Sequence, residues 1–352
     1  MSYRFTFTPS IIRHLQTIER AREQVRLTLL PPVVAERLRL AARVRSTHYS
    51  TRIEGNRLTL AEASQALFEN KRFRGRERDV REVQNYFAAM EQIERWSDGD
   101  EPITEDRIRK LHGLLFKGGR SKATAYRDGQ NVIRDGAGNI VYLPPMTEDV
   151  PGLMGELAVW IARHEADLPT PAVAGLAHYQ FVTIHPFYDG NGRTARALAT
   201  WILYRGGYDL GRFYALEEFY ALDLHGYYAA LVTHPHHNYY EGRAEADLTP
   251  WLDYFVEGMA VIFGRVAEEV ARTPAQTPEM SLLSHLDPQA RRVLSLFEAR
   301  SEIGSSQVAS LLGVSSRHAR SLLVRWAKDG WLELTDPARR VKQYRLKPEA
   351  LR

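Results

Sequence analysis

Apolar residues recur at helical spacing through the first 270 residues of the chain. One such stripe consists of Val83, Phe87, Met90 and Ile93. Residues three or four positions apart lie on one face of an α-helix, so the stripe predicts an amphipathic helix. Similar stripes occur at 108–115, 150–161 and 174–184. Because alternating strand patterns are sparse, we expect this part of the chain to be mainly helical.

Residues that favour helix starts stand at the beginning of several stripes. Thr59 followed by Glu62 has the spacing of a capping box. Thr104 precedes an acidic first turn, and Thr170 with Pro171 opens the stripe at 174–184. These signals fix where three of the predicted helices begin.

One segment interrupts the helical pattern. Between residues 126 and 145, Gly129, Gly136 and Gly138 separate the short apolar pieces 132–133 and 140–142. Glycines between short β-branched and aromatic runs favour a turn between two strands. We therefore expect a β-hairpin here.

A second pattern begins after two prolines near residue 275. We expect a linker at 273–282, because proline ends helices and favours extended chain. Asp287-Pro288 opens a helix, followed by helices at 306–312 and 316–328 and a hairpin within 331–346. This order is that of a winged helix-turn-helix. The predicted domains are thus 1–272, with a core of about 105–260, and 283–352.

The charge is unevenly distributed between the two parts. Residues 281–352 carry a net charge of +6, and the remaining residues carry −2. The helix at 316–328 and the predicted wing contribute cationic and hydroxyl groups to the exposed side, namely Ser316, Arg317, Arg320, Ser321, Arg325, Arg339, Arg340 and Lys342. Such a surface suits DNA phosphates. A protein-docking or dimerisation role remains open, and a homodimer is possible.

Composition narrows the class of protein. Of 352 residues, 44% are hydrophobic and 26% are charged, as in folded globular chains. The longest apolar run falls short of the roughly 18 residues that span a bilayer, and the N-terminus lacks the apolar core of a signal peptide. We expect a cytoplasmic protein. The absence of cysteine excludes disulfides, thiol nucleophiles and cysteine zinc sites.

The strongest chemical signal lies at residues 185–196, which read His-Pro-Phe-Tyr-Asp-Gly-Asn-Gly-Arg-Thr-Ala-Arg before a helical run. Gly190 and Gly192 let a turn of backbone N–H groups face an anion at a helix N-terminus. Arg193 and Arg196 add charge-assisted hydrogen bonds. Asp189 could hold Mg²⁺, and a titratable base, His185, stands just before it.

Two other nucleotide-binding motifs compete with this interpretation. Residues 190–195 match a dinucleotide fingerprint, but that motif follows a strand, and here a helical stripe precedes it. The chain also lacks the lysine-containing pattern of a P-loop. A phosphate site of another type is therefore predicted.

The segment resembles the signature of the Fic family, His-x-Phe-x-Asp/Glu-Gly-Asn-Gly-Arg-x-x-Arg. The matching positions are His185, Phe187, Asp189, Gly190, Asn191, Gly192, Arg193 and Arg196. Fic enzymes transfer AMP from Mg-ATP to a Ser, Thr or Tyr hydroxyl of a protein. The resemblance implies that His185 is the general base and that Asp189 holds Mg²⁺. It also implies that Asn191 and the loop amides bind phosphates, with Arg193 and Arg196 on the β and γ groups.

A second segment supports the same resemblance. Residues 50–55 read Ser-Thr-Arg-Ile-Glu-Gly, similar to the inhibitory motif of one class of Fic proteins. By resemblance, Glu54 pairs with Arg196 and holds ATP unproductively, while Ser50 tethers the helix end. The hairpin at 126–145 resembles the flap that pairs with the target protein, and Tyr227 and Tyr228 resemble residues that border adenine.

These observations predict a mainly α Fic-type helical bundle with a β-hairpin flap and a C-terminal winged helix-turn-helix. The predicted function is protein adenylyl transfer, with self-modification and autoinhibition by Glu54. Two alternatives remain: a nucleotide-sensing regulator that binds DNA, and removal of AMP from a target by the same site. The loop at 234–237 contains three histidines, but its spacing favours a polar loop over a zinc site.

Overall fold

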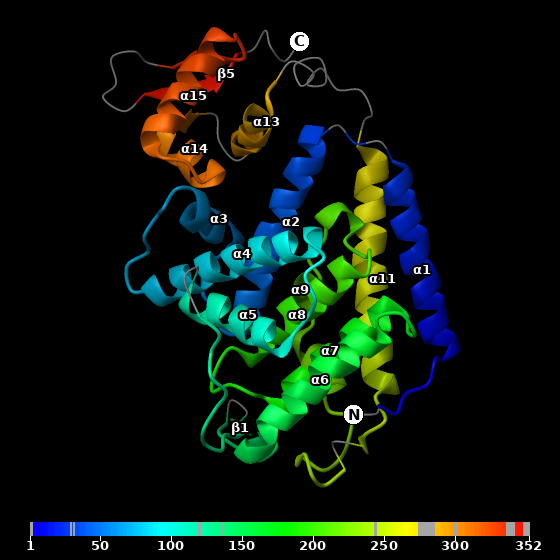
Figure 1. The fold of residues 1–352 in the computed structure, drawn as a ribbon. Coiled ribbons are helices and arrows are strands. Elements are labelled where there is room, and N and C mark those ends of the chain that lie inside the picture. The colour runs from blue at the N-terminus through cyan, green and yellow to red at the C-terminus, as the bar shows by residue number, and fades with distance from the viewer. Residues whose placement is uncertain are drawn as a thin grey trace.

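The computed structural model describes residues 3–28, 30, 32–118, 122–134, 137–242, 245–273, 286–298, 302–335 and 342–347 (Figure 1). Before residue 274 its α-helices are α1 (Pro9–Leu27), α2 (Pro32–Ile53), α3 (Leu60–Phe68), α4 (Glu77–Asp98), α5 (Glu105–Lys117), α6 (Val150–His164), α7 (Thr170–Ile184), α8 (Asn191–Arg205), α9 (Glu217–Leu222), α10 (Leu224–Ala230) and α11 (Thr249–Arg272). Short 3-10 turns lie at η1 (Thr147–Asp149) and η2 (Leu210–Arg212). The mainly helical fold predicted from the sequence is confirmed.

The predicted helix starts are confirmed in detail. The Thr59 side chain accepts a hydrogen bond from the Glu62 amide, and the Glu62 carboxylate accepts one from the Thr59 amide, which completes the capping box of α3. Thr104 caps α5 in the same way, through the amide of Arg107. Each cap satisfies a backbone donor that the first turn of a helix leaves free.

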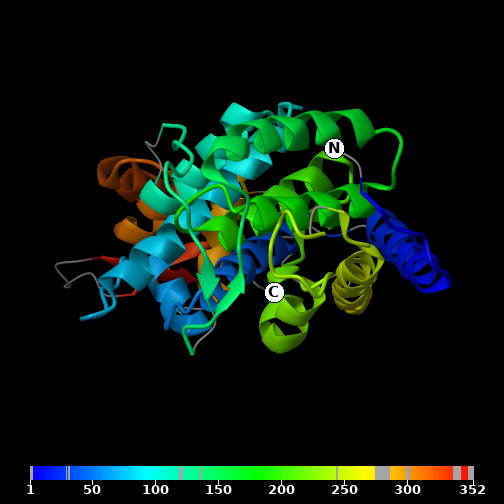
Figure 2. The ribbon, with the colours of Figure 1, turned by 90° about the horizontal axis from the view of Figure 1, so that it is seen from below.

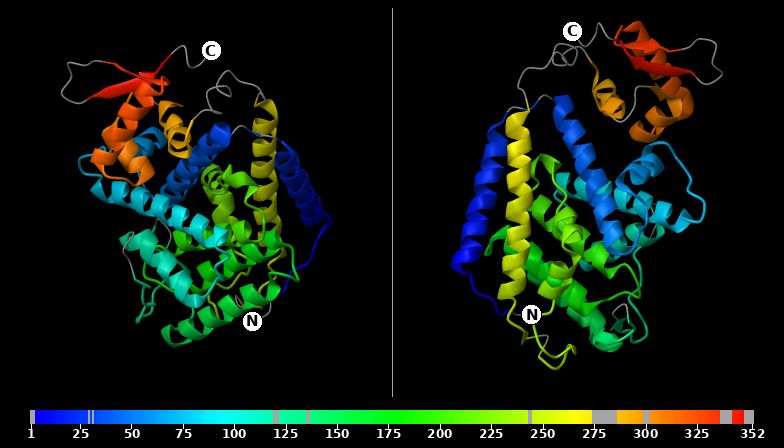
Figure 3. Two further views of the ribbon diagram at one scale, coloured as in Figure 1. Left: turned by 45° about the horizontal axis from the view of Figure 1, so that its top comes forward. Right: turned by 180° about the vertical axis from the view of Figure 1, so that it is seen from behind.

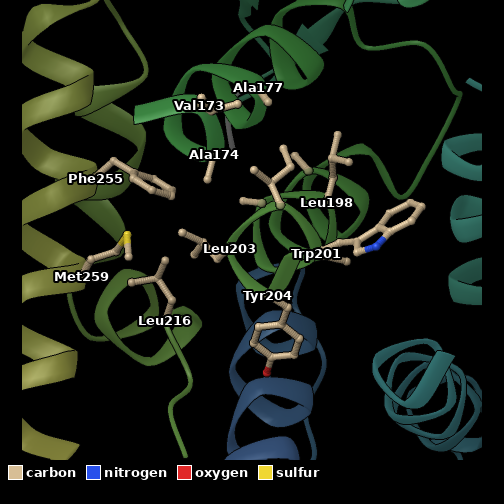
Figure 4. Close-up of a cluster of buried hydrophobic side chains, with 14 of the residues drawn as sticks. Val173, Ala174, Ala177, Leu198, Trp201, Leu203, Tyr204, Leu216, Phe255 and Met259 are labelled. Atoms are coloured by element: carbon tan, nitrogen blue, oxygen red, sulfur yellow. The ribbon is translucent and has the colours of Figure 1, made fainter. Parts of the chain in front are cut away.

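The core is built around α7, nearly all of whose residues are buried. α7 packs against α6, α8 and α11, which surround it with apolar side chains. Figure 4 shows Ala174 of α7 facing Phe255 of α11, with Leu203 of α8 close by. A helix that is apolar on all sides needs this complete cover, and it holds the start of the 185–196 segment rigidly.

α1 and α11 run side by side along one flank of the molecule (Figure 3, right). α2 packs against α4 and α9 and carries the second predicted motif at its C-terminal end. The helix stops at Ile53, and Gly55 follows with φ of +89°, a left-handed conformation that glycine adopts most easily. Glu54 therefore stands just beyond the helix end.

The predicted hairpin is present as β1 (Ile133–Arg134) and β2 (Ile140–Tyr142), which pair antiparallel. It projects from the helical part of the molecule when seen from below (Figure 2). Just after β2, Leu143 exchanges backbone hydrogen bonds with His237 and Tyr239, at 2.7 and 3.1 Å. The loop of histidines thus braces the hairpin.

The C-terminal elements are α13 (Pro288–Leu294), η4 (Ser295–Glu298), β3 (Ile303–Gly304), α14 (Ser305–Leu312), α15 (Ser316–Lys328), β4 (Leu332–Leu334) and β5 (Gln343–Leu346). The three α-helices and the hairpin have the predicted order, whereas β3 was not predicted from the sequence. β3, β5 and β4 form one sheet in that order. The linker and the wing residues Arg339 and Arg340 lie outside the described residues, and the domain limits stay a prediction.

The C-terminal part packs on two helices of the larger part. α13 and η4 contact α2, and α14 contacts α3 (Figure 1). Within the ranges that the structure describes, no helix is both long and apolar enough to cross a membrane.

Candidate functional site

The 185–196 segment forms a tight loop between α7 and α8. His185 ends α7 in a left-handed conformation, φ 51° and ψ 57°, and its amide still donates to Phe181. Gly190 starts α8 with φ of 79°. These two reversals bring the end of one buried helix and the start of the next close together.

His185 is oriented by the carbonyl of its own helix. Its Nδ1 lies 3.2 Å from the Val182 oxygen, and because a carbonyl can only accept, Nδ1 carries the proton. Nε2 is then the basic nitrogen. Burial lowers the pKa of His185 to about 4, so the ring is neutral at physiological pH and can accept a proton.

Arg127 holds the loop from the hairpin side. This buried guanidinium donates from Nε to the His185 carbonyl at 3.1 Å, and its backbone amide donates to Pro186 at 2.9 Å. The other nitrogens reach Pro145 and Thr147, which follow β2. One residue therefore joins the start of the loop to the base of the hairpin.

His112 of α5 supports the middle of the loop. Its ring stacks on Phe187 with 3.7 Å between ring centroids, and its Nε2 lies 2.9 Å from the Asp189 carbonyl. Burial lowers the pKa of His112 to about 4, so the neutral ring donates through Nε2. A Cβ on Gly190 would lie 3.3 Å from the same nitrogen. This close approach favours glycine there.

The start of α8 offers backbone donors to an anion. The first amides of a helix have no intrahelical acceptor, and the positive end of the helix dipole lies at the same place. Asp189 accepts from the Gly190 amide at 2.6 Å, and Thr194 closes the first turn on Gly190. The intervening amides belong to Asn191, Gly192 and Arg193. A phosphate would find both N–H groups and positive potential here.

Arg193 and Asp189 lie together at one side of this turn. The Arg193 side chain is only 4% exposed and pairs with Asp189 at 3.3 Å and Glu82 of α4 at 3.6 Å. The Asp189 side chain is 45% exposed. A cleft of about 570 Å³ opens beside them, and most of its charged lining is cationic, with Arg78, Arg81 and Lys117.

Arg196 is the most enclosed cation of the loop. Its Nε donates to the Ser50 hydroxyl and its Nη2 donates to the Ser50 carbonyl, both at 2.9 Å. Nη2 also donates to Glu54 at 2.8 Å. Burial alone would lower the pKa of this guanidinium, but the Glu54 carboxylate beside it raises it above its ordinary value.

Gly192 leaves the space that Glu54 occupies. A Cβ at this position would lie 2.4 Å from the Glu54 carboxylate and 3.1 Å from Arg196. The carboxylate thus sits directly over the first turn of α8, where the backbone donors face outward. The contact between Glu54 and Arg196 that the sequence motif predicts is present, and Ser50, in the last turn of α2, binds Arg196 directly.

Two of the predicted nucleotide-binding residues turn their side chains inward. The Asn191 side chain is buried and bonds both backbone groups of Phe187, at 3.0 and 2.7 Å, so it shapes the loop, and its backbone amide faces the start of α8. Tyr227 is 1% exposed and its hydroxyl lies 2.9 Å from His178, and its role beside adenine stays a prediction. Tyr228 is 49% exposed and stays a prediction for that role.

Sequence reasoning missed Arg127, His112 and Glu82. His112 follows Leu111 within a predicted apolar stripe, and a histidine among buried positions was a usable signal. Arg127 and Glu82 gave no such signal, because each acts through a contact more than 50 residues away in the chain.

Known proteins match this chain in the same region. The Fic/DOC family profile matches residues 102–203. "Protein adenylyltransferase Fic" of Nematostella vectensis is 33% identical over 166 residues, which are 46% of this chain and 37% of that protein. The Drosophila yakuba protein of the same name is 29% identical over 204 residues, covering 56% and 39%. The chain thus spans about two fifths of the length of these curated relatives.

One solved structure is similar over almost the whole chain. A Fic family protein from Desulfovibrio desulfuricans G20 has a TM-score of 0.65 and 26% identity, and the match covers 99% of both chains. Together with the loop geometry and the profile match, this similarity establishes that the chain contains a Fic/DOC family domain, which includes the loop between α7 and α8.

Proposed function

We propose that the protein is an adenylyltransferase that moves AMP from ATP to a hydroxyl group of a protein. The main support for this proposal is the arrangement of the α7–α8 loop. The neutral His185, with a basic Nε2, lies at one end, and the N-terminus of α8 with two buried arginines lies at the other. The adenylyltransferase names of the relatives support this assignment.

The residues suit a direct displacement at phosphorus. Nε2 of His185 accepts the proton of the target hydroxyl, whose oxygen forms a bond to the α-phosphorus of ATP. The bond from that phosphorus to the bridging oxygen of the β-phosphate breaks, and diphosphate leaves. Arg193 and Arg196 compensate the negative charge of the departing phosphates. A well-placed base contributes about 10²- to 10⁴-fold, and positioning and electrostatics supply the rest.

A divalent cation fits beside this loop. Asp189 has a half-exposed carboxylate, and Mg²⁺ commonly takes one or two carboxylates together with phosphate oxygens and water. The residues present therefore suit Mg²⁺ with Asp189 as its protein ligand. When bound, the ion would neutralise phosphate charge. Arg78, whose guanidinium lies 3.6 Å from Asp189, would have to move aside.

The geometry also supports autoinhibition by Glu54. Its carboxylate takes the hydrogen bond of Arg196 that a terminal phosphate would otherwise accept, and it lies over the first turn of α8. Two anions cannot share one guanidinium nitrogen without repulsion. Productive binding of ATP therefore requires Glu54 to leave.

Intact-mass measurement after incubation with ATP and Mg²⁺ tests the proposal. We expect one added AMP group in Glu54→Gly, little in wild type, and none in Glu54→Gly/His185→Ala. ATP-binding calorimetry on the double variant should still show binding, since His185 makes no phosphate contact in this scheme. An adduct that persists without His185 would contradict the assigned base. If neither the protein itself nor any added candidate target gains AMP, the proposed transfer reaction would be contradicted.

A second candidate function rests on α15. Its outer face presents Arg317 and Arg320, and the helix contains no acidic residue. We propose that this face binds duplex DNA through phosphates. Binding should weaken steeply with salt, and Arg317→Ser/Arg320→Ser should weaken it further, whereas Arg13→Ser on α1 should not. A DNA affinity that does not depend on salt, or that Arg317→Ser/Arg320→Ser leaves unchanged, would contradict this second function.

A further inference from the structure

Two cationic clefts adjoin each other on α4. The inner cleft, of about 570 Å³, is the one beside Asp189 and Arg193. The outer cleft, of about 490 Å³, opens between the segment that follows α3 and the start of α4, and Lys71 and Arg72 line it. Arg81 lines both clefts, so together they form one surface that begins at the α7–α8 loop.

Two packed helices place the cations of the inner cleft. α4 and α5 lie against each other (Figure 1). Arg78 and Arg81 are three residues apart on α4, so they share a face of that helix. Asn85, one turn further along, donates from Nδ2 to the Phe116 carbonyl at 3.4 Å. This contact holds the end of α5, and with it Lys117, beside the same face of α4.

The carboxylates of the inner cleft already have cationic partners. Glu82 accepts a hydrogen bond from Arg78 at 2.9 Å and lies 3.6 Å from Arg193. Asp189 lies 3.3 Å from Arg193 and 3.6 Å from Arg78. These two acids therefore neutralise Arg78 and Arg193 and leave the other cations of the cleft uncompensated.

The remaining cations face solvent. Arg81 and Lys117 of the inner cleft and Arg72 of the outer cleft are exposed, and within the ranges that the structure describes none of them forms an ion pair. Lys71 donates to the neutral side chain of Gln65 at 2.9 Å. The surface thus carries positive charge that its own carboxylates do not balance, and it suits an anionic partner.

The acids between these cations favour a partner with separate charges over a polyphosphate. Glu82 lines the inner cleft and Glu77 lines the outer one, so a nucleic acid that follows the surface would bring its phosphates against both. A peptide can instead place single carboxylates on Arg81 and Lys117 and avoid the two acids. Phe116, which lines the inner cleft and is 46% exposed, adds an aromatic contact of the kind enriched at protein interfaces.

We propose that the two clefts are the docking site for an acidic segment of the target protein, in which carboxylates near the modified hydroxyl bind Arg81 and Lys117 and more distant ones bind Arg72. The place of the inner cleft supports this assignment, because its lining includes two residues of the α7–α8 loop. The inference rests on the proposed function for the identity of the acceptor. It predicts that the modified hydroxyl stands next to Asp or Glu residues in the target.

Fluorescence anisotropy with labelled peptides and the full chain, without ATP, tests the docking. The probe is a short peptide with one tyrosine flanked by glutamates, and its control carries glutamine in place of each glutamate. The acidic peptide should bind more tightly than the control, and added salt should weaken its binding.

Matched variants locate the binding. Arg81→Gln/Lys117→Gln should raise the Kd of the acidic peptide about 2- to 30-fold, as expected for the loss of two exposed ion pairs. Arg95→Gln/Lys110→Gln removes the same charge from exposed positions of the same two helices, outside both clefts, and should leave the Kd nearly unchanged.

A charge exchange separates specific pairing from general attraction. Arg81→Glu/Lys117→Glu should lose the acidic peptide and bind a version with lysine in place of each glutamate, which the wild type should not bind. A loss of packing alone would not reverse the preference. Failure of the variant to prefer the lysine peptide would contradict the assigned contacts.

Other results would also overturn the inference. One is an equal Kd for the acidic and glutamine peptides, and another is an equal loss in the control variant. A labelled single-stranded oligonucleotide whose binding depends on Arg81 and Lys117 more strongly than that of the peptide would assign the clefts to nucleic acid. A fall in ATP affinity of Glu54→Gly on adding Arg81→Gln/Lys117→Gln, measured by calorimetry, would assign them to the nucleotide.

Transfer is scored separately from docking, in Glu54→Gly with ATP and Mg²⁺. Charge-dependent binding of the acidic peptide without any AMP on it would contradict the proposed reaction and support the docking site. AMP transfer with the same KM for the acidic and glutamine peptides would contradict the docking site alone.

Discussion

The carboxylate of Glu54 lies 2.8 Å from the guanidinium of Arg196, although the two residues are 142 positions apart in the chain. The first follows the C-terminal end of α2, and the second lies in the second turn of α8. The space between them is free of side chain only because residue 192 is glycine. An acidic group thus occupies the position in which the loop is best equipped to bind an anion.

This pair leads to a graded prediction for substitutions at Glu54. A hydrogen bond to a charged group contributes about 1.5–3 kcal/mol, which corresponds to roughly 10- to 100-fold in an equilibrium. Glu54→Gly should therefore raise the rate of self-modification by about that factor. Glu54→Gln, which keeps the size but not the charge, should give a smaller increase. Glu36→Gln, on the same helix and paired with Arg39, should leave the rate unchanged. Equal rates for all three variants would contradict inhibition by Glu54.

Gly192→Ala should lower the affinity for ATP even when Glu54 is absent. The added methyl would stand 3.1 Å from Arg196, in the space that the carboxylate fills and that a phosphate would need. In the Glu54→Gly background we expect about a tenfold rise in the dissociation constant of ATP, measured by calorimetry, which corresponds to about 1.4 kcal/mol. Gly152→Ala in α6 meets no atom within 4 Å and should change nothing. If Gly192→Ala binds ATP with unchanged affinity, the phosphates of ATP do not bind in the space over residue 192.

Local patterns in the sequence were enough to predict most of the helices and the hairpins. The helix at 316–328 was predicted with the same ends as α15, because Gly313 and Ser315 mark the turn and the N-cap. The predicted contact of Glu54 with Arg196 is also present, since a motif specified both partners. β3 was missed because a strand of two residues has no period to detect.

The orientation of side chains at the site was harder to predict. Asn191 and Tyr227 were assigned to the nucleotide from their place in a pattern, but a pattern does not say which way a side chain points. In the structure Asn191 turns back to Phe187, and Tyr227 turns inward to His178. Arg127 acts through a partner 58 positions away. Contacts between distant segments depend on the packing of whole helices, which no local pattern encodes.

Arg127→Met should reduce the rate of transfer more than the affinity for ATP. The substitution removes donors to His185 and Thr147, so the base loses its fixed orientation while Arg196 and the α8 amides are untouched. We expect kcat to fall at least about tenfold with little change in KM for ATP, and stability to fall by about 2–4 kcal/mol, since buried carbonyls lose charged donors. Arg134→Met, in the exposed hairpin where the guanidinium donates to the Gly138 carbonyl, is the matched control. A rise in KM without a change in kcat would contradict the assigned role.

Three histidines with lowered pKa values predict that the protein loses stability in mild acid. Burial lowers the pKa of His112 and His185 to about 4 and that of His178 to about 3, from 6.5. Between pH 6.5 and 4 the unfolded chain therefore binds more protons than the folded protein, so stability falls as pH falls through this window. A shift from 6.5 to about 4 corresponds to about 3 kcal/mol per group once pH reaches the lower value.

Denaturant unfolding at a series of pH values measures this slope. With three such groups, the free energy of unfolding should fall by up to about 4 kcal/mol per pH unit in the window, which places acid unfolding between about pH 4 and 6. His178→Gln removes one titrating group while keeping a partner for Tyr227, so its slope should be about one third smaller. Replacement of the exposed His225 by Gln should leave the slope as it is. A stability that is flat between pH 7 and 4.5 would show that these rings are already protonated or exposed in the folded protein, and His185 could then not be the neutral base that the transfer reaction needs.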